Sequence, residues 1–167
     1  MASDERVVLA PSNHQPWTQL AATMALRISE HLDSARVEHI GSTAVPGLPA
    51  RPVVDLAVGV EAGQIAYAAA ELARHGFDLE GQRPAHAWLS HPDRSARSFV
   101  IHVCEFDGPE WQRRLRFRDI LIADEHQRAK YLAVKRSAAA TTHDWGEYTA
   151  AKASVVAEIL ASADEPR

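Results

Sequence analysis

The stretch from residue 35 to residue 60, where two apolar runs flank a loop rich in small residues, constrains the fold most. The first run ends at Gly41-Ser42-Thr43, and the second, residues 53–60, contains Asp55. These runs predict two strands, at 36–40 and 52–60, joined by a loop of about eleven residues. A carboxylate inside a strand is costly to bury without a partner, so we expect Asp55 to have one.

The Gly-Ser-Thr turn offers backbone N–H groups and two hydroxyls, which are suited to holding an anion. Together, the strand, the turn and the strand-borne carboxylate indicate phosphate and metal binding side by side. The alternative is a tight β-turn in which Asp55 forms a salt bridge with Arg51. The pattern alone leaves both interpretations open.

Composition narrows the class of protein. The 167 residues suffice for one domain, which we expect to span residues 1–167 with its core at about 7–160. A formal net charge of −4 disfavours a protein that coats nucleic acid, because such proteins are normally basic. The single cysteine, Cys104, excludes an internal disulfide and a cysteine-rich zinc site. No run approaches the roughly 18 apolar residues of a membrane span, so we expect a cytoplasmic protein with no membrane partner.

Apolar spacing and turn residues predict the order of helices and strands. We expect a helix at 17–32, strands at 36–40 and 52–60, and a helix at 61–76 ending at Gly76. A strand at 77–79, a hairpin region at 80–96 and a strand at 97–106 should follow. Three helices should complete the chain: the first begins at Pro109, the second covers 125–140, and the third follows a cap at Thr142-His143-Asp144. This order predicts an α/β (α+β) fold, in which helices pack on a sheet and the C-terminal part is helical.

The segment Glu38-His39-Ile40-Gly41-Ser42-Thr43-Ala44-Val45-Pro46-Gly47-Leu48 resembles the signature of the GrpB family. Pro109-Glu110-Trp111, Tyr131-Leu132-Ala133-Val134-Lys135 and Tyr148-Thr149-Ala150-Ala151-Lys152 resemble that family's helices, so the resemblance covers about residues 7–160. It implies a nucleotidyltransferase-like mixed sheet of the DNA polymerase beta type, with a C-terminal helical extension. Relatives fused to dephospho-CoA kinase also imply that a protein partner is plausible. Many relatives carry His-x-His on the strand where this chain has Val100-Ile101-His102.

The resemblance implies a site for a nucleotide or another anionic small molecule. Asp55 and His102 are the candidate catalytic residues, and we expect them to lie on adjacent strands and on the same face of the sheet. Asp55 is also the candidate ligand for Mg²⁺. The candidate ligand- or phosphate-binding residues are His39, Gly41, Ser42, Thr43, Arg51, Arg118, Lys135, Tyr148 and Lys152.

The metal site predicted in this way is incomplete. A nucleotidyltransferase normally has a second carboxylate two residues after the first, and this chain has Ala57 there. Glu105 on the later strand has the opposite parity to His102, so only one of them can face the site. An aspartate with a histidine is a weak Mg²⁺ site, because that ion prefers oxygen ligands.

The remaining polar residues are expected to play no part in the site. We expect Arg113, Arg114 and Arg116 to form a solvated face, and we expect five scattered histidines to lie on the surface. These are His75, His86, His91, His126 and His143. A nucleophile–base pair of Ser42 and His39 is disfavoured, because no orienting acid is predicted near it.

Two hypotheses for function follow. The first is a nucleotide- or phosphate-binding, nucleotidyltransferase-like protein that transfers a nucleotidyl group to a small molecule or a protein. The second is a non-catalytic ligand-binding or accessory module that has kept the pocket and lost the metal carboxylates. Ala57 favours the second hypothesis, and the Gly-Ser-Thr signature predicts a pocket under either.

Overall fold

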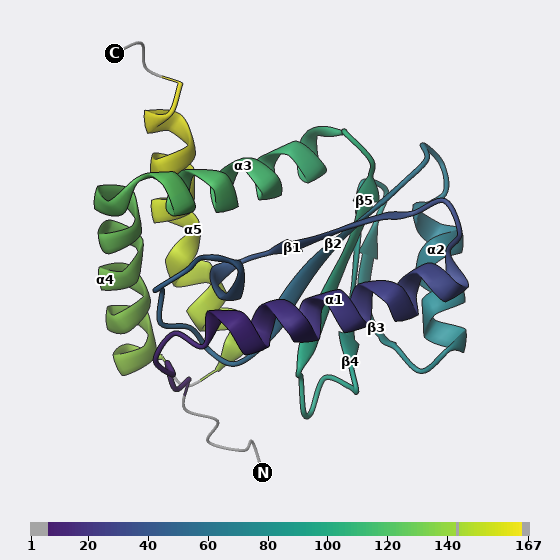
Figure 1. Cartoon of the computed structure of the whole chain (residues 1–167), viewed down its shortest axis with the longest axis horizontal. Coiled ribbons are helices and arrows are strands. Elements are labelled where there is room, and N and C mark those ends of the chain that lie inside the picture. Colours follow the sequence, from purple (N-terminus) through teal and green to yellow (C-terminus); the bar gives the residue numbers. More distant parts are fainter. Residues whose placement is uncertain (1–6, 143, 165–167) are drawn as a thin grey trace.

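The structure is a computed structural model that describes residues 7–142 and 144–164 (Figure 1). Its strands are β1 (Arg36–Ile40), β2 (Val54–Val60), β3 (Asp78–Arg83), β4 (His86–His91) and β5 (Phe99–Glu105). Its helices are α1 (His14–His31), α2 (Ile65–Arg74), α3 (Pro109–Ala123), α4 (Glu125–Thr141) and α5 (Trp145–Ser162), with a short 3₁₀ turn, η1 (Ser42–Ala44). None of the helices in the described ranges is long and apolar enough to cross a membrane.

One five-stranded sheet, in the order β1-β2-β5-β4-β3, organises the chain. β2 and β5 pair in parallel, while the other three neighbouring pairs are antiparallel. The predicted α/β (α+β) fold, a mixed sheet with packed helices and a helical C-terminal part, is therefore confirmed.

Side chains alternate across the sheet and give it two different faces. On β2, Val54, Leu56, Val58 and Val60 belong to the main core, where they pack with α1 and α2. The intervening residues of β2 face the other way, toward α3. On each strand of the site, the side chains of one face therefore pack into the main core, while those of the opposite face can carry polar groups.

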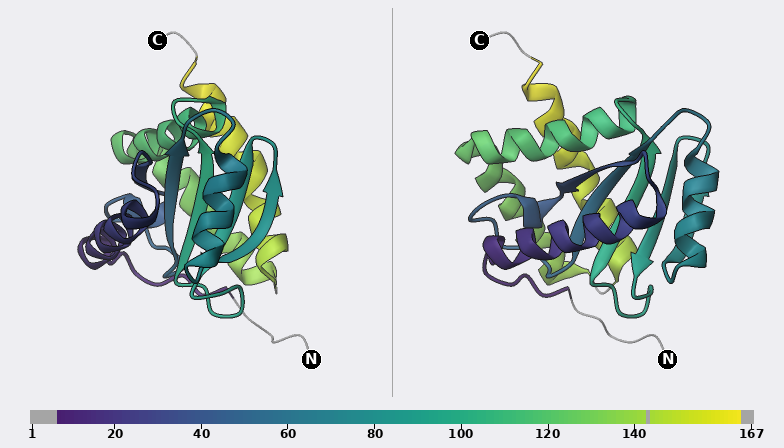
Figure 2. Two further views of the ribbon diagram at one scale, coloured as in Figure 1. Left: turned by 90° about the vertical axis from the view of Figure 1, so that its right-hand side faces the viewer. Right: turned by 45° about the vertical axis from the view of Figure 1, so that its right-hand side comes forward.

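The second face of the sheet is only partly covered. Ala57, Ile40, Cys104 and Trp111 form a small cluster beneath α3. Gly59 makes room for it, because a β-carbon there would lie 2.9 Å from the Trp111 ring. The C-terminal helices pack against one another and against the loop after β1, and α5 lies on the opposite side of the sheet from α1 (Figure 2). The part of this face that α3 leaves open is where the candidate site lies.

Local signals account for most of the element ends. Gly76 adopts φ +94 just after α2, as expected of a glycine that ends a helix. Asp144 caps α5 by accepting a hydrogen bond from the backbone N–H of Glu147. The helix expected from residue 61 begins later, at Ile65, because Gly63 with φ +80 forms a turn first. Residues 1–6, 143 and 165–167 lie outside the described residues, so the expected surface position of His143 stays a prediction.

Candidate functional site

A cleft of about 500 Å³ opens on the partly covered face of the sheet. It lies between the strands on one side and α3, α4 and α5 on the other, and the Gly41-Ser42 turn also lines it. Trp88 and Phe117 are its aromatic walls. Its polar and charged lining residues are Ser42, Asp55, Glu80, Arg83, His86, His102, Arg113, Arg114, Tyr131, Thr149 and Lys152.

Asp55 occupies the floor of this cleft and lies closely against the turn. Gly41 has φ +74, and a β-carbon there would lie 2.7 Å from Oδ2 of Asp55. The glycine is therefore needed both for its left-handed backbone and for the approach of the carboxylate. The neighbouring Ser42 shares a side-chain hydrogen bond with Tyr131 of α4.

His102 is the partner of Asp55. The two residues lie on adjacent parallel strands, and Nε2 of His102 is 3.3 Å from Oδ1 of Asp55. The prediction that they share a face and lie close together is confirmed. Nδ1 of His102 is in turn 3.1 Å from Nε2 of His86, whose ring stacks on the ring of Trp88. Three polar side chains from three adjacent strands thus lie in one row, each within hydrogen-bonding distance of the next.

Two of these contacts correct the expectations for the surface. His86 was expected to be exposed, but it is part-buried between His102 and Arg114. Arg114 was expected on a solvated face, but its side chain is only 24% exposed and lies against His86 and Glu110. Arg116 is exposed as expected, whereas Arg113 is exposed but also lines the cleft. The error arose because helical spacing shows which residues share a face of α3, but not where the sheet leaves that helix uncovered.

Burial controls the protonation of the site. It lowers the pKa of His86 to about 3, with the Arg114 charge acting in the same direction. Burial and Arg114 also lower the pKa of His102, although Asp55 opposes them. Burial lowers the pKa of Lys152 to about 8, again against the attraction of Asp55. At neutral pH both imidazoles are therefore neutral while Lys152 is largely protonated.

Several predicted site residues lie outside the cleft lining. Thr43 is fully buried and its Oγ1 is 2.8 Å from Nε2 of His39, so the two tie the turn to β1. Arg118 binds Glu38 and the carbonyl oxygen of His39, and thereby joins α3 to β1. None of these contacts reaches the cleft in the present arrangement.

The two predicted ligand-binding lysines, Lys152 and Lys135, lie in different surroundings. Lys152 lines the cleft, and its Nζ lies 4.3 Å from the centre of the Tyr148 ring. Lys135 is 1% exposed and donates to the carbonyl oxygen of Pro49 at 3.0 Å, which fixes the loop before β2. Tyr148, which is also buried, and Arg51 are not among the cleft-lining residues.

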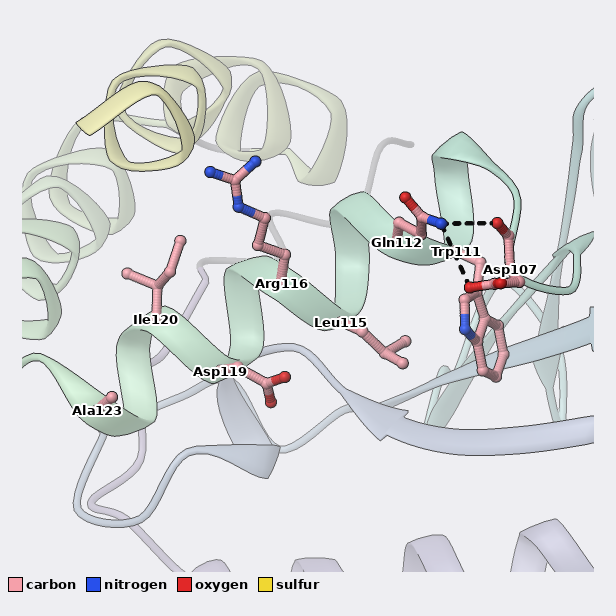
Figure 3. Close-up of a pocket in the computed structure, with 8 residues that line it drawn as sticks. All are labelled: Asp107, Trp111, Gln112, Leu115, Arg116, Asp119, Ile120 and Ala123. Carbon is pink, nitrogen blue, oxygen red and sulfur yellow. Dashed lines mark hydrogen bonds between the residues drawn. The ribbon is translucent and has the colours of Figure 1, made fainter. Parts of the chain in front are cut away.

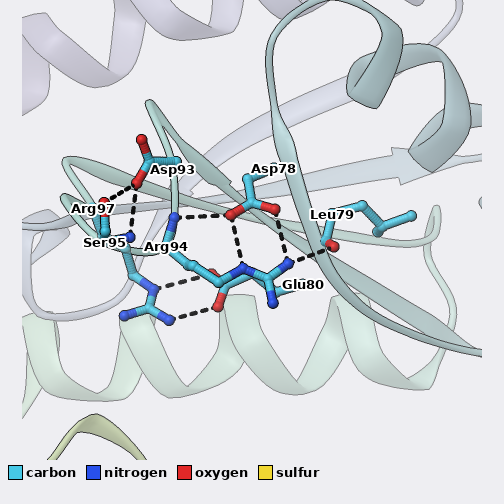
Figure 4. Close-up of polar contacts among 7 residues, drawn as sticks. All are labelled: Asp78, Leu79, Glu80, Asp93, Arg94, Ser95 and Arg97. Atoms are coloured by element: carbon cyan, nitrogen blue, oxygen red, sulfur yellow. Dashed lines mark hydrogen bonds and ion pairs between the residues drawn. The ribbon is translucent and has the colours of Figure 1, made fainter. Parts of the chain in front are cut away.

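Glu80 is the second carboxylate of the cleft, and a neighbouring loop holds it in place. Arg97 binds both of its oxygens, at 2.5 and 3.0 Å, and lowers the pKa of that carboxyl group. Arg94 makes a similar two-pronged contact with Asp78 on the same strand (Figure 4). Glu80 is therefore ion-paired before any ligand arrives.

The carboxylates needed for a Mg²⁺ site do not assemble. Ala57 is fully buried beneath α3, and Glu105 points to the exposed opposite side. In the described part of the chain, no three His, Cys, Asp or Glu side chains are placed to hold a metal ion. Asp55 instead has His102, Arg114 and Lys152 around it, which are cations or nitrogen donors. These residues do not fit Mg²⁺, because that ion takes several oxygen ligands.

Two other hollows adjoin α3. One of about 220 Å³ continues the cleft between α3 and α5, and shares Phe117, Tyr131 and Lys152 with it. The other, of about 540 Å³, is an open groove that runs along α3 past Trp111 and Leu115 (Figure 3). The groove contains none of the predicted site residues, so the cleft beside Asp55 is the candidate site.

Comparison with known proteins adds a family to this geometry. A family profile described as "GrpB protein" matches residues 6–162. A UPF0157 protein of Deinococcus radiodurans is 46% identical over 139 residues, covering 83% of this chain and 73% of that protein. The crystal structure of the conserved protein GrpB from Enterococcus faecalis has a TM-score of 0.78 and 26% identity, covering 95% of this chain and 100% of that one. A distant likeness to the Cid1 poly(U) polymerase has a TM-score of 0.45 and 13% identity, covering 71% of this chain and 42% of that one.

Proposed function

The chain belongs to the GrpB family, and from that premise we propose that it binds a nucleotide or a similar phosphorylated small molecule in the cleft beside Asp55. The charge of the cleft lining carries this proposal. Four cationic side chains, Arg83, Arg113, Arg114 and Lys152, line one cleft with two carboxylates, of which Glu80 is already paired with Arg97. Cations that converge in a partly buried site favour an anion, because each charge interacts more strongly there than in water.

The ligand contacts divide by their chemistry into polar and aromatic groups. The Gly41-Ser42 turn and Lys152 would hold phosphate oxygens, while Trp88 and Phe117 offer apolar walls for the rest of the molecule. His39 and Thr43 would act through the shape of the turn, and Arg118 and Lys135 through the elements that they hold. Tyr148 and Arg51 would act through Lys152, which lies over the Tyr148 ring and feels the charge of Arg51. In this arrangement the ligand's charge is neutralised by side chains, so Mg²⁺ adds little.

Calorimetric titration is the direct test. Inorganic pyrophosphate, nucleoside triphosphates and dephospho-coenzyme A would each be titrated with Mg²⁺ and with EDTA. We expect at least one to bind, with a Kd that changes less than about threefold between the two conditions. Lys152→Met should weaken that binding by about tenfold or more, because it removes a desolvated charge from the site.

Lys130→Met is the matched control, because Lys130 is an exposed lysine that pairs with Glu158 away from the cleft. Failure of every phosphorylated compound to bind would overturn the proposal. Binding that depends strongly on Mg²⁺ would show instead that other groups complete a metal site. Equal affinity of wild type and Lys152→Met would move the ligand out of this cleft.

Nucleotidyl transfer is the second candidate function, and the contact between Asp55 and His102 favours it. An ionised carboxylate beside a neutral imidazole can accept the proton of an attacking hydroxyl group. Incubation with nucleoside triphosphates, followed by intact-mass measurement of the protein and of added acceptors, would detect the transferred group. Loss of that transfer in Asp55→Asn, with nucleotide binding retained, would support it. Binding without transfer would leave the accessory-module hypothesis.

A further inference from the structure

Arg114 is poorly satisfied in the position that it holds. Its Nη2 lies 3.3 Å from Nε2 of His86 and 3.5 Å from a carboxylate oxygen of Glu110. Both distances are long for a charge-assisted contact. Its Nε is enclosed and has no hydrogen-bond partner among the described residues. Because buried N–H groups are normally paired and Arg114 lines the cleft, a ligand oxygen is the natural partner for this guanidinium.

The row of His86, His102 and Asp55 beyond Arg114 contains a mismatch between hydrogen-bond donors and acceptors. A guanidinium can only donate, so its contact with His86 requires Nε2 of His86 to carry no proton. A carboxylate can only accept, so the contact with Asp55 requires a proton on Nε2 of His102. With both imidazoles neutral, Nδ1 of His102 then carries no proton either. Two unprotonated nitrogens face each other at 3.1 Å, and the contact between His86 and His102 is not made.

Removing the Arg114 contact resolves the mismatch. His86 can then carry its proton on Nε2 and donate to Nδ1 of His102, while Nε2 of His102 donates to Asp55. The change is a tautomer shift in His86, in which one proton leaves Nδ1 and one arrives at Nε2 through solvent. Neither the charge nor the proton count of the site changes. The row of His86, His102 and Asp55 is fully hydrogen-bonded only in that state.

We propose that the guanidinium of Arg114 binds a phosphate group of the ligand with two hydrogen bonds and gives up its contact with His86. His86 then changes to the tautomer that can donate a hydrogen bond to His102, which in turn donates to Asp55. Two phosphate oxygens accept from Nε and Nη2 of Arg114, the paired geometry for which guanidinium is suited and ammonium is not. His86 and His102 act as positioning residues, because the hydrogen bonds that link them to Asp55 are all formed only when phosphate is bound to Arg114. The inference rests on the proposed function only in requiring that a phosphate enters the cleft.

The test is nitrogen NMR of the histidine side chains with inorganic pyrophosphate as the probe. At neutral pH, Nε2 of His86 should have the shift of an unprotonated nitrogen in the free protein and of a protonated one at saturation. Arg114→Lys keeps the charge but loses the paired geometry. It should bind pyrophosphate about tenfold or more weakly and show no tautomer shift even when saturated. Arg116→Lys on the same helix is the matched control, because Arg116 lies outside the cleft and pairs with Asp164.

His86→Leu provides a second, independent variant. It removes the group that competes for Arg114, so pyrophosphate should bind about twofold to fivefold more tightly. A merely structural His86 would give weaker or unchanged binding instead. Pyrophosphate that binds the wild type without changing the His86 tautomer, or that binds Arg114→Lys equally well, would overturn the inference and leave the proposed function standing. No binding of pyrophosphate or any phosphorylated compound would overturn both.

Discussion

The side chain of Asp55 on β2 packs so closely against Gly41, just after β1, that there is no room for a side chain on the glycine. A β-carbon on Gly41 would lie 2.7 Å from Oδ2 of Asp55, and the glycine also holds φ +74. The first residue of the signature turn therefore makes room for a carboxylate that follows fourteen residues later. This contact explains why the turn and the aspartate belong to one site.

Gly41→Ala should consequently destabilise the protein and displace Asp55. Gly41 combines φ +74 with ψ −171, a conformation that costs a non-glycine residue about 1–3 kcal/mol, and overpacking adds about 1–3 kcal/mol. Gly47→Ala is a matched control, because Gly47 has φ +78 in the same loop but nothing within 4 Å of its β-carbon position. Urea unfolding should show a clearly larger loss for Gly41→Ala. Equal losses in the two variants would mean that Asp55 moves aside freely.

Lys152 predicts a specific pH dependence of ligand binding. Its pKa in the empty site is lowered to about 8, chiefly by burial. An anion binds the protonated form, so the Kd for pyrophosphate should be level below about pH 8 and rise by up to about tenfold per pH unit above it. Lys152→Arg stays protonated throughout and should therefore have a flatter profile, whatever its starting affinity. Parallel profiles for the two proteins would exclude Lys152 as an anion contact.

Sequence reasoning succeeded where the signal is local or periodic. Alternation along each strand predicted which residues share a face with Asp55 and which with His102, but it was the pairing of β2 with β5 in the structure that brought the two side chains together. Gly76 and Asp144 mark helix ends through the backbone chemistry of single residues. The succession of these elements predicted the α/β (α+β) class, while the mixed sheet was implied by the family resemblance.

The missed residues depend on packing between distant segments. His86 and Arg114 are separated by 28 residues, and nothing in either neighbourhood indicates that they meet. Thr43 looks like an anion ligand in the motif, yet its hydroxyl turns inward to His39. The spacing of residues in the sequence predicts which side chains share a face of a helix or strand. The direction of one hydroxyl or guanidinium group depends instead on the space that the neighbouring helix or strand leaves for it.

Ala57→Asp tests whether the site lacks only one carboxylate to become a metal site. Ala57 is 0% exposed and packs against Ile40, Cys104 and Trp111, so a carboxylate there would be buried with only the neutral imidazole of His102, its register partner on β5, beside it. We expect a loss of about 3–5 kcal/mol in the free energy of unfolding. Mg²⁺ should not restore it, and Ala57→Asn serves as the uncharged control. A Mg²⁺-dependent rise in Tm for Ala57→Asp alone would show that the site does accept the ion.

Lys135 predicts a pH dependence of stability rather than of binding. Burial lowers its pKa from 10.5 to about 7 in the folded protein. Below about pH 7 the lysine is protonated in both states, so the full cost of the buried charge is present there. Between about pH 7 and pH 10 only the unfolded chain binds the proton, and the free energy of unfolding therefore rises with pH.

Lys135→Met removes this dependence while keeping an apolar side chain of similar length. The free energy of unfolding of Lys135→Met, compared with that of wild type, should be highest at about pH 6. By about pH 9 this difference should fall by on the order of 2–3 kcal/mol, because the wild type gains stability over that range. Loss of the hydrogen bond to the carbonyl oxygen of Pro49 adds a roughly constant penalty, because neutral lysine donates as well. Lys130→Met, at an exposed lysine, should differ from wild type by the same amount at every pH. Urea unfolding of the three proteins across this range is the measurement, and parallel curves for Lys135→Met and wild type would show that Lys135 is not held as a buried charge.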